Sequence, residues 1–272
     1  MKRSANIVSA FFVLAASGSV MGQSLYNSGG FESPRFSAGT LDAQDGGLWS
    51  VDPSSATGHS VVTSPTAGAS PFGSQMVRLN PAASGTVFSW PDITAGVAAR
   101  TAGNDVIMTS YKIFLPVAGE LATGANGAFG TIAYNAALAS MGGIRFRLDT
   151  GVALFLMDPD GAGPQTFTNY TSGTTPFAIS RGVWHDVGFA VNIANRQLSF
   201  LVNGALVTQG FVSSSTGLSL GEVDLVSSAI GTIPGTALVD DYSVSAIFVV
   251  PTPGAAALLG LGGLMAARRR RT

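Results

Sequence analysis

Short apolar runs separated by Gly, Asn, Asp or Pro fill the chain between residues 23 and 248. None of these runs has the 3.6-residue period of an amphipathic helix, and several alternate apolar with polar residues, as half-buried strands do. Many short strands between turns are typical of a β-sandwich or a jelly roll. We therefore predict an all-β sandwich, with its clearest strands at 75–79, 86–90, 106–115, 144–149, 152–157, 184–192, 197–202 and 237–248.

The run 144–148 shows the alternation most clearly, since Ile144, Phe146 and Leu148 are separated by two arginines. One face of this strand should be buried and the other wet. The Asp-Thr-Gly turn at 149–151 lies between this run and the next predicted strand. The two strands are therefore predicted to pair as a hairpin.

A second hairpin is predicted around Asn203 and Gly204, which separate the runs 198–202 and 205–207. The Asn-Gly pair readily takes the positive φ values of a tight type I′ turn. In the predicted strand 184–192, the alternation of apolar residues slips once near His185 and Asp186. We expect a β-bulge there.

The first 22 residues have the order of a secretory signal peptide. Lys2 and Arg3 are followed by an apolar stretch at 10–16 and then by small residues before Gln23. The apolar stretch is too short to cross a hydrocarbon core of about 30 Å as a helix. We predict cleavage after Gly22 by signal peptidase, so the protein should be exported.

The last 24 residues, 249–272, combine a Pro-rich motif, an uncharged stretch rich in Gly and Ala, and a basic end. Basic residues resist translocation, so the end of the chain should stay on the cytoplasmic side while the body is outside. The uncharged stretch is shorter than the roughly 20 residues of a full membrane span, which predicts weak and transient insertion. The Pro-rich motif is Pro251, Thr252 and Pro253, and the basic cluster is Arg268, Arg269, Arg270 and Arg271.

This order of elements resembles the PEP-CTERM sorting signal of Gram-negative bacteria. The resemblance departs from the family at Thr252, where the family name implies Glu. It implies that an exosortase-like membrane protease cuts near the Pro-rich motif and transfers the protein to the cell surface or the extracellular matrix. The chain then divides into a signal peptide (1–22), a sandwich body (23–248) and a sorting tail (249–272), and the hydrophobic helices expected at the two ends are processing signals.

Charge and cysteine content narrow the function of the body. Without the two terminal segments, eight of the 14 Lys and Arg residues remain against all 15 Asp and Glu residues. A mildly acidic body argues against nucleic-acid binding, which needs clustered basic side chains. No cysteine is present, so the fold has neither disulfides nor thiolate metal sites. Roughly 225 residues are enough for one large sandwich that is stabilised by its core alone.

Residues 182–189, 196–200 and 202–204 resemble concanavalin A-like jelly rolls of the laminin-G and pentraxin type. In those domains a strand that contains Trp is followed by a strand that ends in Asn-Gly, and Trp184 and Asn203 have this order here. The resemblance implies a jelly-roll sandwich but no activity, because this fold carries lectins, adhesins and hydrolases alike.

Residues 27–32, Asn-Ser-Gly-Gly-Phe-Glu, and 238–244, Leu-Val-Asp-Asp-Tyr-Ser-Val, resemble the first and last strands of carbohydrate-binding jelly rolls. In those domains the two strands are adjacent, and their acidic residues often hold a structural calcium ion. Calcium binds several carboxylate and main-chain oxygens together. The resemblance therefore makes Glu32, Asp241 and Asp240 candidate calcium ligands. The alternative is that the two aspartates are only a polar step before an outward-facing edge strand.

Glu222 and Asp224 lie in a segment that resembles the Glu-x-Asp-x-x-Glu strand of laminarinase-type glycoside hydrolases. Alternation places both on one face of a strand. A retaining hydrolase also needs a general acid about 5 to 5.5 Å from its nucleophile. Ser227 takes the place of that acid in the sequence and cannot protonate a leaving group. We therefore do not expect hydrolysis.

Other candidate sites lack necessary parts. The segment 158–163 opens like a calcium loop but has no closing Glu, so a hairpin turn is expected. His59, in a Gly-Ser turn, and His185 have no second His or Cys at zinc-ligand spacing. We expect Trp184 in the core, whereas the sequence leaves the positions of Trp49 and Trp90 open.

These observations favour an exported, non-catalytic module that binds polysaccharide or mediates adhesion at the cell surface. A degenerate or unusual glycan hydrolase is the alternative from the enzyme class. A purely structural coat protein without a ligand is the third possibility.

Overall fold

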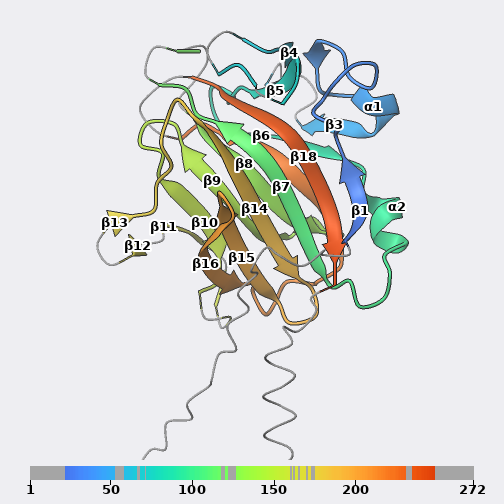
Figure 1. Cartoon of the computed structure of the whole chain (residues 1–272). Coiled ribbons are helices and arrows are strands. Elements are labelled where there is room, and N and C mark those ends of the chain that lie inside the picture. Colours follow the sequence, from blue (N-terminus) through green and yellow to red (C-terminus); the bar gives the residue numbers. More distant parts are fainter. Residues whose placement is uncertain are drawn as a thin grey trace, which may run out of the picture.

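The computed structural model describes residues 22–248, apart from 53–57, 66–67, 71, 118–119, 122–126, 160, 162, 165, 170, 173–174 and 231–234. These residues form two large antiparallel sheets that pack face to face (Figure 1), so the predicted all-β sandwich of the jelly-roll class is confirmed. The predicted signal peptide (1–21 of it) and the sorting tail lie outside the described residues. Within the described part of the chain, no helix is long and apolar enough to span a membrane.

The nine-stranded sheet has the order β16-β15-β14-β7-β18-β5-β4-β2, with β1 also paired to β18. It faces the viewer in Figure 1. Its strands are β1 (Gly22–Asn27), β2 (Gly39–Thr40), β4 (His59–Thr63), β5 (Gln75–Leu79), β7 (Val106–Phe114), β14 (Trp184–Asn192), β15 (Gln197–Val202), β16 (Ala205–Phe211) and β18 (Ala237–Ile247).

The seven-stranded sheet has the order β11-β10-β9-β8-β17-β6-β3. Its strands are β3 (Trp49–Asp52), β6 (Thr86–Pro91), β8 (Ala128–Asn135), β9 (Ser140–Arg147), β10 (Ala153–Met157), β11 (Thr166–Asn169) and β17 (Leu220–Ser228). The pair β12 (Thr171–Ser172) and β13 (Thr175–Pro176) and the short helices α1 (Gln44–Gly47) and α2 (Thr94–Ala98) complete the described elements.

The last strand, β18, lies at the centre of the nine-stranded sheet. One edge of it pairs with β7, while the other pairs first with β5 and then with β1. A bulge separates the two halves, because the pairs of Asp240 with Lys112 and of Ser243 with Ser110 are out of step by one residue. Asp241 in this bulge has a left-handed φ of 52°. The adjacency of the first and last strands, implied by the sequence resemblance, is therefore present.

Aromatic side chains fill the core at the N-terminal end of the sandwich. Trp49 is buried and donates from Nε1 to the Tyr26 hydroxyl at 2.7 Å. The ring of Tyr242 packs against that of Trp49, with their centroids 5.7 Å apart, and its hydroxyl donates to the carbonyl of Val223 at 2.7 Å. Trp49, left open by the sequence, is thus a core residue whose polar atom is satisfied.

The run 144–148 follows its predicted alternation on one side only. Ile144, Phe146 and Leu148 are buried in the core between the sheets, as expected. Arg145 was expected in water and is instead buried on the outer face of the seven-stranded sheet. The alternation predicted the burial of the three apolar side chains. The burial of Arg145 on the opposite face could not be predicted from it, because that burial depends on neighbouring strands.

His59 was expected in a Gly-Ser turn, and the structure corrects this. It begins β4 and is fully buried between the two sheets. Its Nδ1 lies 2.7 Å from Ser89 Oγ and its Nε2 lies 2.9 Å from Ser227 Oγ. The Ser227 hydroxyl donates to the carbonyl of Asn80, so it must accept from Nε2–H, which assigns the neutral tautomer. Burial lowers the pKa of His59 to about 3.

Candidate functional site

The outer face of the nine-stranded sheet carries an aromatic cluster around Trp184. On β14, Val187 points into the core, so Trp184 and Asp186 alternate to the outside. Trp184 pairs in register with Phe114 of β7, and their ring centroids are 5.6 Å apart. The expectation that Trp184 fills the core is therefore wrong, since it lies half-buried on the outer surface of the sandwich.

The irregular apolar pattern near His185 has a different cause from the one expected. β14 pairs with β7 in unbroken register from Trp184 to Asn192, so no bulge is present in this pairing. Instead, His185 itself points inward and is nearly buried. Its Nε2 donates to the carbonyl of Ser180 at 2.8 Å, and its Nδ1 accepts from the side-chain amide of Asn203 at 3.1 Å. The alternation of apolar residues is interrupted because the polar residue His185 occupies a position on the inner face of the strand.

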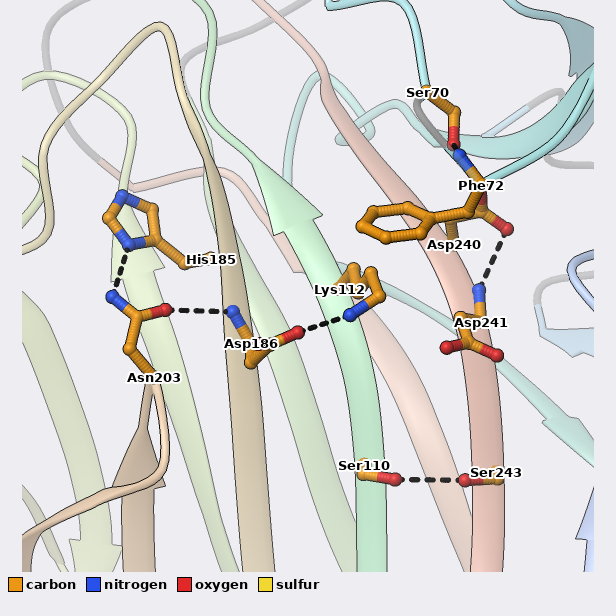
Figure 2. Close-up of polar contacts among 10 residues, drawn as sticks. All are labelled: Ser70, Phe72, Ser110, Lys112, His185, Asp186, Asn203, Asp240, Asp241 and Ser243. Atoms are coloured by element: carbon orange, nitrogen blue, oxygen red, sulfur yellow. Dashed lines mark hydrogen bonds and ion pairs between the residues drawn. The ribbon is translucent and has the colours of Figure 1, made fainter.

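The predicted Asn-Gly turn positions this part of the site. Asn203 and Gly204 have φ values of 51° and 76°, as a type I′ turn requires. The Asn203 amide oxygen accepts from the backbone N–H of Asp186 at 3.0 Å, and Asp186 forms an ion pair with Lys112 of β7. Figure 2 shows this line of contacts from His185 to Lys112 across the sheet. The turn thus fixes the strand that carries Trp184.

A loop before β5 adds a second exposed ring. Phe72 is 48% exposed, and its ring centroid lies 6.3 Å from that of Trp184 in an edge-to-face arrangement. The ammonium group of Lys112 lies 4.2 Å from the Phe72 ring centroid, within the range of a cation–π contact. We call the exposed surface formed by Trp184, Phe72 and Lys112 the aromatic shelf.

A pocket of about 410 Å³ opens beside the shelf, with Trp184 and Phe114 as its aromatic wall. Trp184 Nε1 donates to the carbonyl of Ala69 at 3.2 Å, which fixes the indole ring at the rim. A Cβ at Gly68 would lie 2.7 Å from the Phe114 ring, so only glycine lets this loop approach so closely. The other lining residues are Val117, Glu120 and Gly182.

The predicted calcium residues lie near the β18 bulge, next to the shelf, because Asp240 pairs with Lys112 and accepts a hydrogen bond from Ser70, two residues before Phe72 (Figure 2). Glu32 and Asp240 flank Gly30, since a Cβ at Gly30 would lie 3.7 Å from Glu32 Cγ and 3.6 Å from Asp240 Oδ1. Asp241 is exposed and meets Asp240 through its backbone N–H, at 2.7 Å from Oδ1 (Figure 2). Among the described residues, no three His, Cys, Asp or Glu side chains gather as a metal site. A calcium ion here would need main-chain or hydroxyl oxygens as well.

Both carboxylates already accept hydrogen bonds from the protein. Glu32 accepts from the backbone N–H groups of Ser74 and Gln75 at 2.7 and 2.8 Å and from the Ser74 hydroxyl at 2.7 Å. Burial alone would raise the pKa of Glu32, but these donors together hold it below its usual range. Asp240 accepts from the Ser70 hydroxyl, yet burial, with the charges of Asp241 and Glu32, raises its pKa to about 6.

The segment that resembles a hydrolase strand is β17, in the other sheet. Glu222 and Asp224 lie on its outer face, as alternation predicts, and Val223 points into the core. Ser227 lies on the inner face, where it binds His59. The pairing of β17 with β8 is regular from Val223 to Ser228, so no bulge turns Ser227 toward the two carboxylates. Ser227, at the third position of the motif, therefore forms no site with Glu222 and Asp224.

The remaining sequence candidates are structural. The segment 158–163 begins the connection between the antiparallel strands β10 and β11, which agrees with the expected hairpin turn. Asp158 is buried, and its carboxylate accepts from the backbone N–H of Gly163 at 2.7 Å. Phe72, which the sequence did not single out, is the principal addition to the site. Phe72 lies in a loop, where no alternation of apolar and polar residues marks it in the sequence.

No protein-family model matches this chain, and no curated protein does. Among solved structures, the chain is similar to a carbohydrate esterase from a Shiga toxin-encoding bacteriophage (12% identity, 83% of this chain and 99% of that chain, TM-score 0.45). It is also similar to an alginate lyase from a Chlorella virus (14% identity, 77% and 98%, TM-score 0.44). A sialidase shares 10% identity over 74% of this chain but only 17% of its own length, with a TM-score of 0.39.

Proposed function

We propose that this protein is an exported, non-catalytic polysaccharide-binding module that holds sugar rings against the aromatic shelf. The observation that carries the proposal is the pair of rings on the outer face, the half-buried Trp184 and the exposed Phe72, beside a pocket. Aromatic faces suit the apolar C–H faces of sugar rings, and exposed aromatic side chains gain most from such a contact. Lys112, Asp186 and Glu120 place charged hydrogen-bonding groups around the rings.

Exposed apolar side chains are concentrated at this place. Val117 lines the pocket together with Trp184, and it is 42% exposed. Phe72, which is also exposed, packs edge-to-face against the ring of Trp184. Two large exposed apolar residues therefore lie next to one tryptophan. Contiguous apolar patches on a soluble protein commonly mark binding surfaces. A patch bordered by charged groups suits a ligand that is itself amphipathic, as sugars are.

The pocket has the size expected of a small-ligand site, for which roughly 300 to 1,000 Å³ is usual. Its volume of about 410 Å³ is enough for a short stretch of a glycan at the rim. The shelf extends from the pocket along Phe72 and Lys112, so a longer chain could continue over the sheet. We therefore infer an oligosaccharide segment as ligand, rather than a single monosaccharide.

The terminal segments support export to the cell surface. The order of charge, apolar core and small residues at 1–22 supports secretion, and the Pro-rich motif, apolar stretch and arginines at 249–272 support sorting by an exosortase-like protease. A surface protein of this kind would meet extracellular polysaccharide. The adhesion and structural-coat alternatives share the location but predict no shelf-dependent glycan binding.

A structural calcium ion near the β18 bulge is part of the proposal. The raised pKa of Asp240 arises from burial and from the nearby charges of Asp241 and Glu32. A cation at this point would offset that repulsion, with main-chain oxygens of the 27–32 segment completing its coordination. The ion would then tie the first strand of the body to the last.

The experiment that tests the proposed function measures binding of the body, residues 23–248, to a panel of polysaccharides, with Trp184→Ala and Phe72→Ala as variants. Loss of binding in both variants supports the shelf. Release of reducing ends by the wild type but not by Glu222→Gln would instead favour the hydrolase alternative.

A further inference from the structure

The outer face of the seven-stranded sheet is unusual because several of its side chains are buried although no third layer of described elements covers them. Apolar residues of this face, Ile132, Leu156 and Val226, form their own small cluster. Two charged residues are buried among them: Arg145 is 6% exposed and Asp224 is 2% exposed. A wet sheet face ordinarily leaves such groups in water.

Arg145 lies across the sheet instead of standing out from it. It pairs with Gly130 of β8, which has no side chain to block its path. Its Nη1 reaches over β8 and donates to the hydroxyl of Ser228 on β17. The ring of Phe167 covers the guanidinium, with its centroid 3.7 Å from Cζ. The guanidinium thus lies between the backbone of Gly130 on one side and the ring of Phe167 on the other.

No carboxylate among the described residues neutralises this guanidinium. The ion pairs of the described chain join Arg35 to Asp45, Arg100 to Asp105, Lys112 to Asp186, and Arg147 to Asp149. The Nε atom of Arg145 is buried and has no hydrogen-bond partner. Burial lowers the pKa of Arg145 to about 10, so it stays a cation at neutral pH. A buried cation without a counter-charge costs stability, and a purely structural role does not explain it.

Two neighbouring ionisable groups, Asp224 and Tyr134, are neutral donors rather than counter-ions. Burial, with the charge of Glu222, raises the pKa of Asp224 to about 9, so its carboxyl is protonated at neutral pH. Its Oδ1 is also buried without a hydrogen-bond partner. Burial raises the pKa of Tyr134 to about 12, which keeps the phenol a neutral donor. Glu222 is less buried and lies at the margin, opposite Tyr134.

We propose that this face is a second ligand site, in which Arg145 binds the anionic group of an acidic polysaccharide. A guanidinium binds a uronate carboxylate or a sulfate ester through parallel hydrogen bonds, and both groups share this chemistry. The aromatic side chains Phe167, Phe88 and Tyr134 lie at its margin, where sugar rings could pack. The site is separate from the aromatic shelf and does not depend on it.

The test uses residues 23–248 and compares binding of three oligosaccharides by isothermal titration calorimetry: an oligouronate, a sulfated oligosaccharide and a neutral oligoglucan. The wild type should bind at least one acidic oligosaccharide. Arg145→Gln should weaken that binding at least about tenfold while leaving binding of the neutral oligoglucan unchanged. Arg147→Gln is the matched control, because Arg147 lies two residues away on the same face and is already paired with Asp149. It should bind like the wild type.

A preference for the oligouronate assigns a carboxylate as the ligand group, and a preference for the sulfated sugar assigns a sulfate. Trp184→Ala should keep the acidic binding, which separates this site from the shelf. If Arg145→Gln folds poorly, thermal shift of the wild type and of Arg147→Gln replaces it, and only acidic sugars should raise their melting temperatures. Equal binding of acidic oligosaccharides by the wild type and Arg145→Gln, or no binding of any acidic sugar, would overturn the proposal.

Discussion

Ser227 Oγ lies 2.9 Å from His59 Nε2, inside the sandwich and on the opposite face of β17 from Glu222. This contact joins β17 of one sheet to β4 of the other. It assigns Ser227 to the interior of the protein and removes it from any chemistry on the outer face. His59 itself is kept neutral by its burial, which lowers its pKa and has a consequence for stability.

Stability should fall in acid because of His59. Its pKa is about 3 in the folded protein, against about 6.5 for an ordinary histidine. The unfolded chain therefore binds an extra proton below about pH 6.5, and unfolding becomes easier as the pH falls from there toward 3. The free energy of unfolding can fall by at most about 1.4 kcal/mol per pH unit through this one group. The free energy of unfolding in urea should be measured for the wild type and for His59→Gln at pH 7.5 and 4.5. Since the other groups titrate in both proteins, the difference between the two isolates the contribution of His59. The stability difference should shrink or reverse at pH 4.5, and a constant difference would contradict the prediction.

Asp224 should have the opposite pH dependence. Its pKa is raised to about 9, so the stability linked to it is complete below about pH 4 and is lost as the pH rises through 9. Asp224→Asn cannot ionise and should be more stable than the wild type at pH 8, by at least about 1 kcal/mol. The advantage should be smaller at pH 5. Thermal unfolding at the two pH values checks it, and an advantage that does not grow with pH would speak against a buried, protonated carboxyl.

Calcium should raise the melting temperature if it binds near the β18 bulge. An ion that binds only the folded chain stabilises it by mass action. Chelation should therefore lower the melting temperature of the wild type, and Glu32→Ala should remove that difference. Glu222→Ala, which changes an acidic residue of the other sheet, serves as control. Identical melting curves of the wild type with calcium and with chelator would end the idea.

The tail should be absent from the mature protein. Four arginines resist passage through the membrane, at about 2.5 to 3.5 kcal/mol each on insertion scales, and so hold the apolar stretch in place for cleavage near Pro251, Thr252 and Pro253. Mass spectrometry of the native protein should find no peptide beyond about Gly254. Replacing Arg268–Arg271 with serine should disturb retention and processing. An intact C-terminal peptide from the surface-exposed protein would refute cleavage.

The strands were largely predictable because their apolar alternation is local. Strand β14 was placed correctly from its pattern, as were β5, β7 and β15. β8 was missed, since Gly130 interrupts the pattern that would mark it. Glycine there is required by the close approach of β9, where an added Cβ would lie 2.0 Å from the carbonyl of Ile144. Such contacts between strands leave no mark in a single segment.

The candidate site was less predictable because it depends on contacts between distant segments. Trp184 was assigned to the core, since alternation does not show which side of a strand faces the other sheet. Its surroundings come from a loop more than 100 residues earlier, through Ala69 and Phe72. Arg145 was expected in water for the same reason: its cover, Phe167, is on β11.

The most direct test of the polysaccharide-binding proposal is affinity electrophoresis of residues 23–248 through gels that contain neutral and acidic polysaccharides. The wild type should be retarded by at least one of them. Trp184→Ala and Phe72→Ala should each weaken that retardation at least about tenfold, which corresponds to about 1.4 kcal/mol. Leu206→Ala is the matched control, because Leu206 is 47% exposed on β16 and lies outside the shelf. It should migrate like the wild type. Equal retardation of all four proteins, or no retardation of the wild type in any gel, would contradict the proposed function.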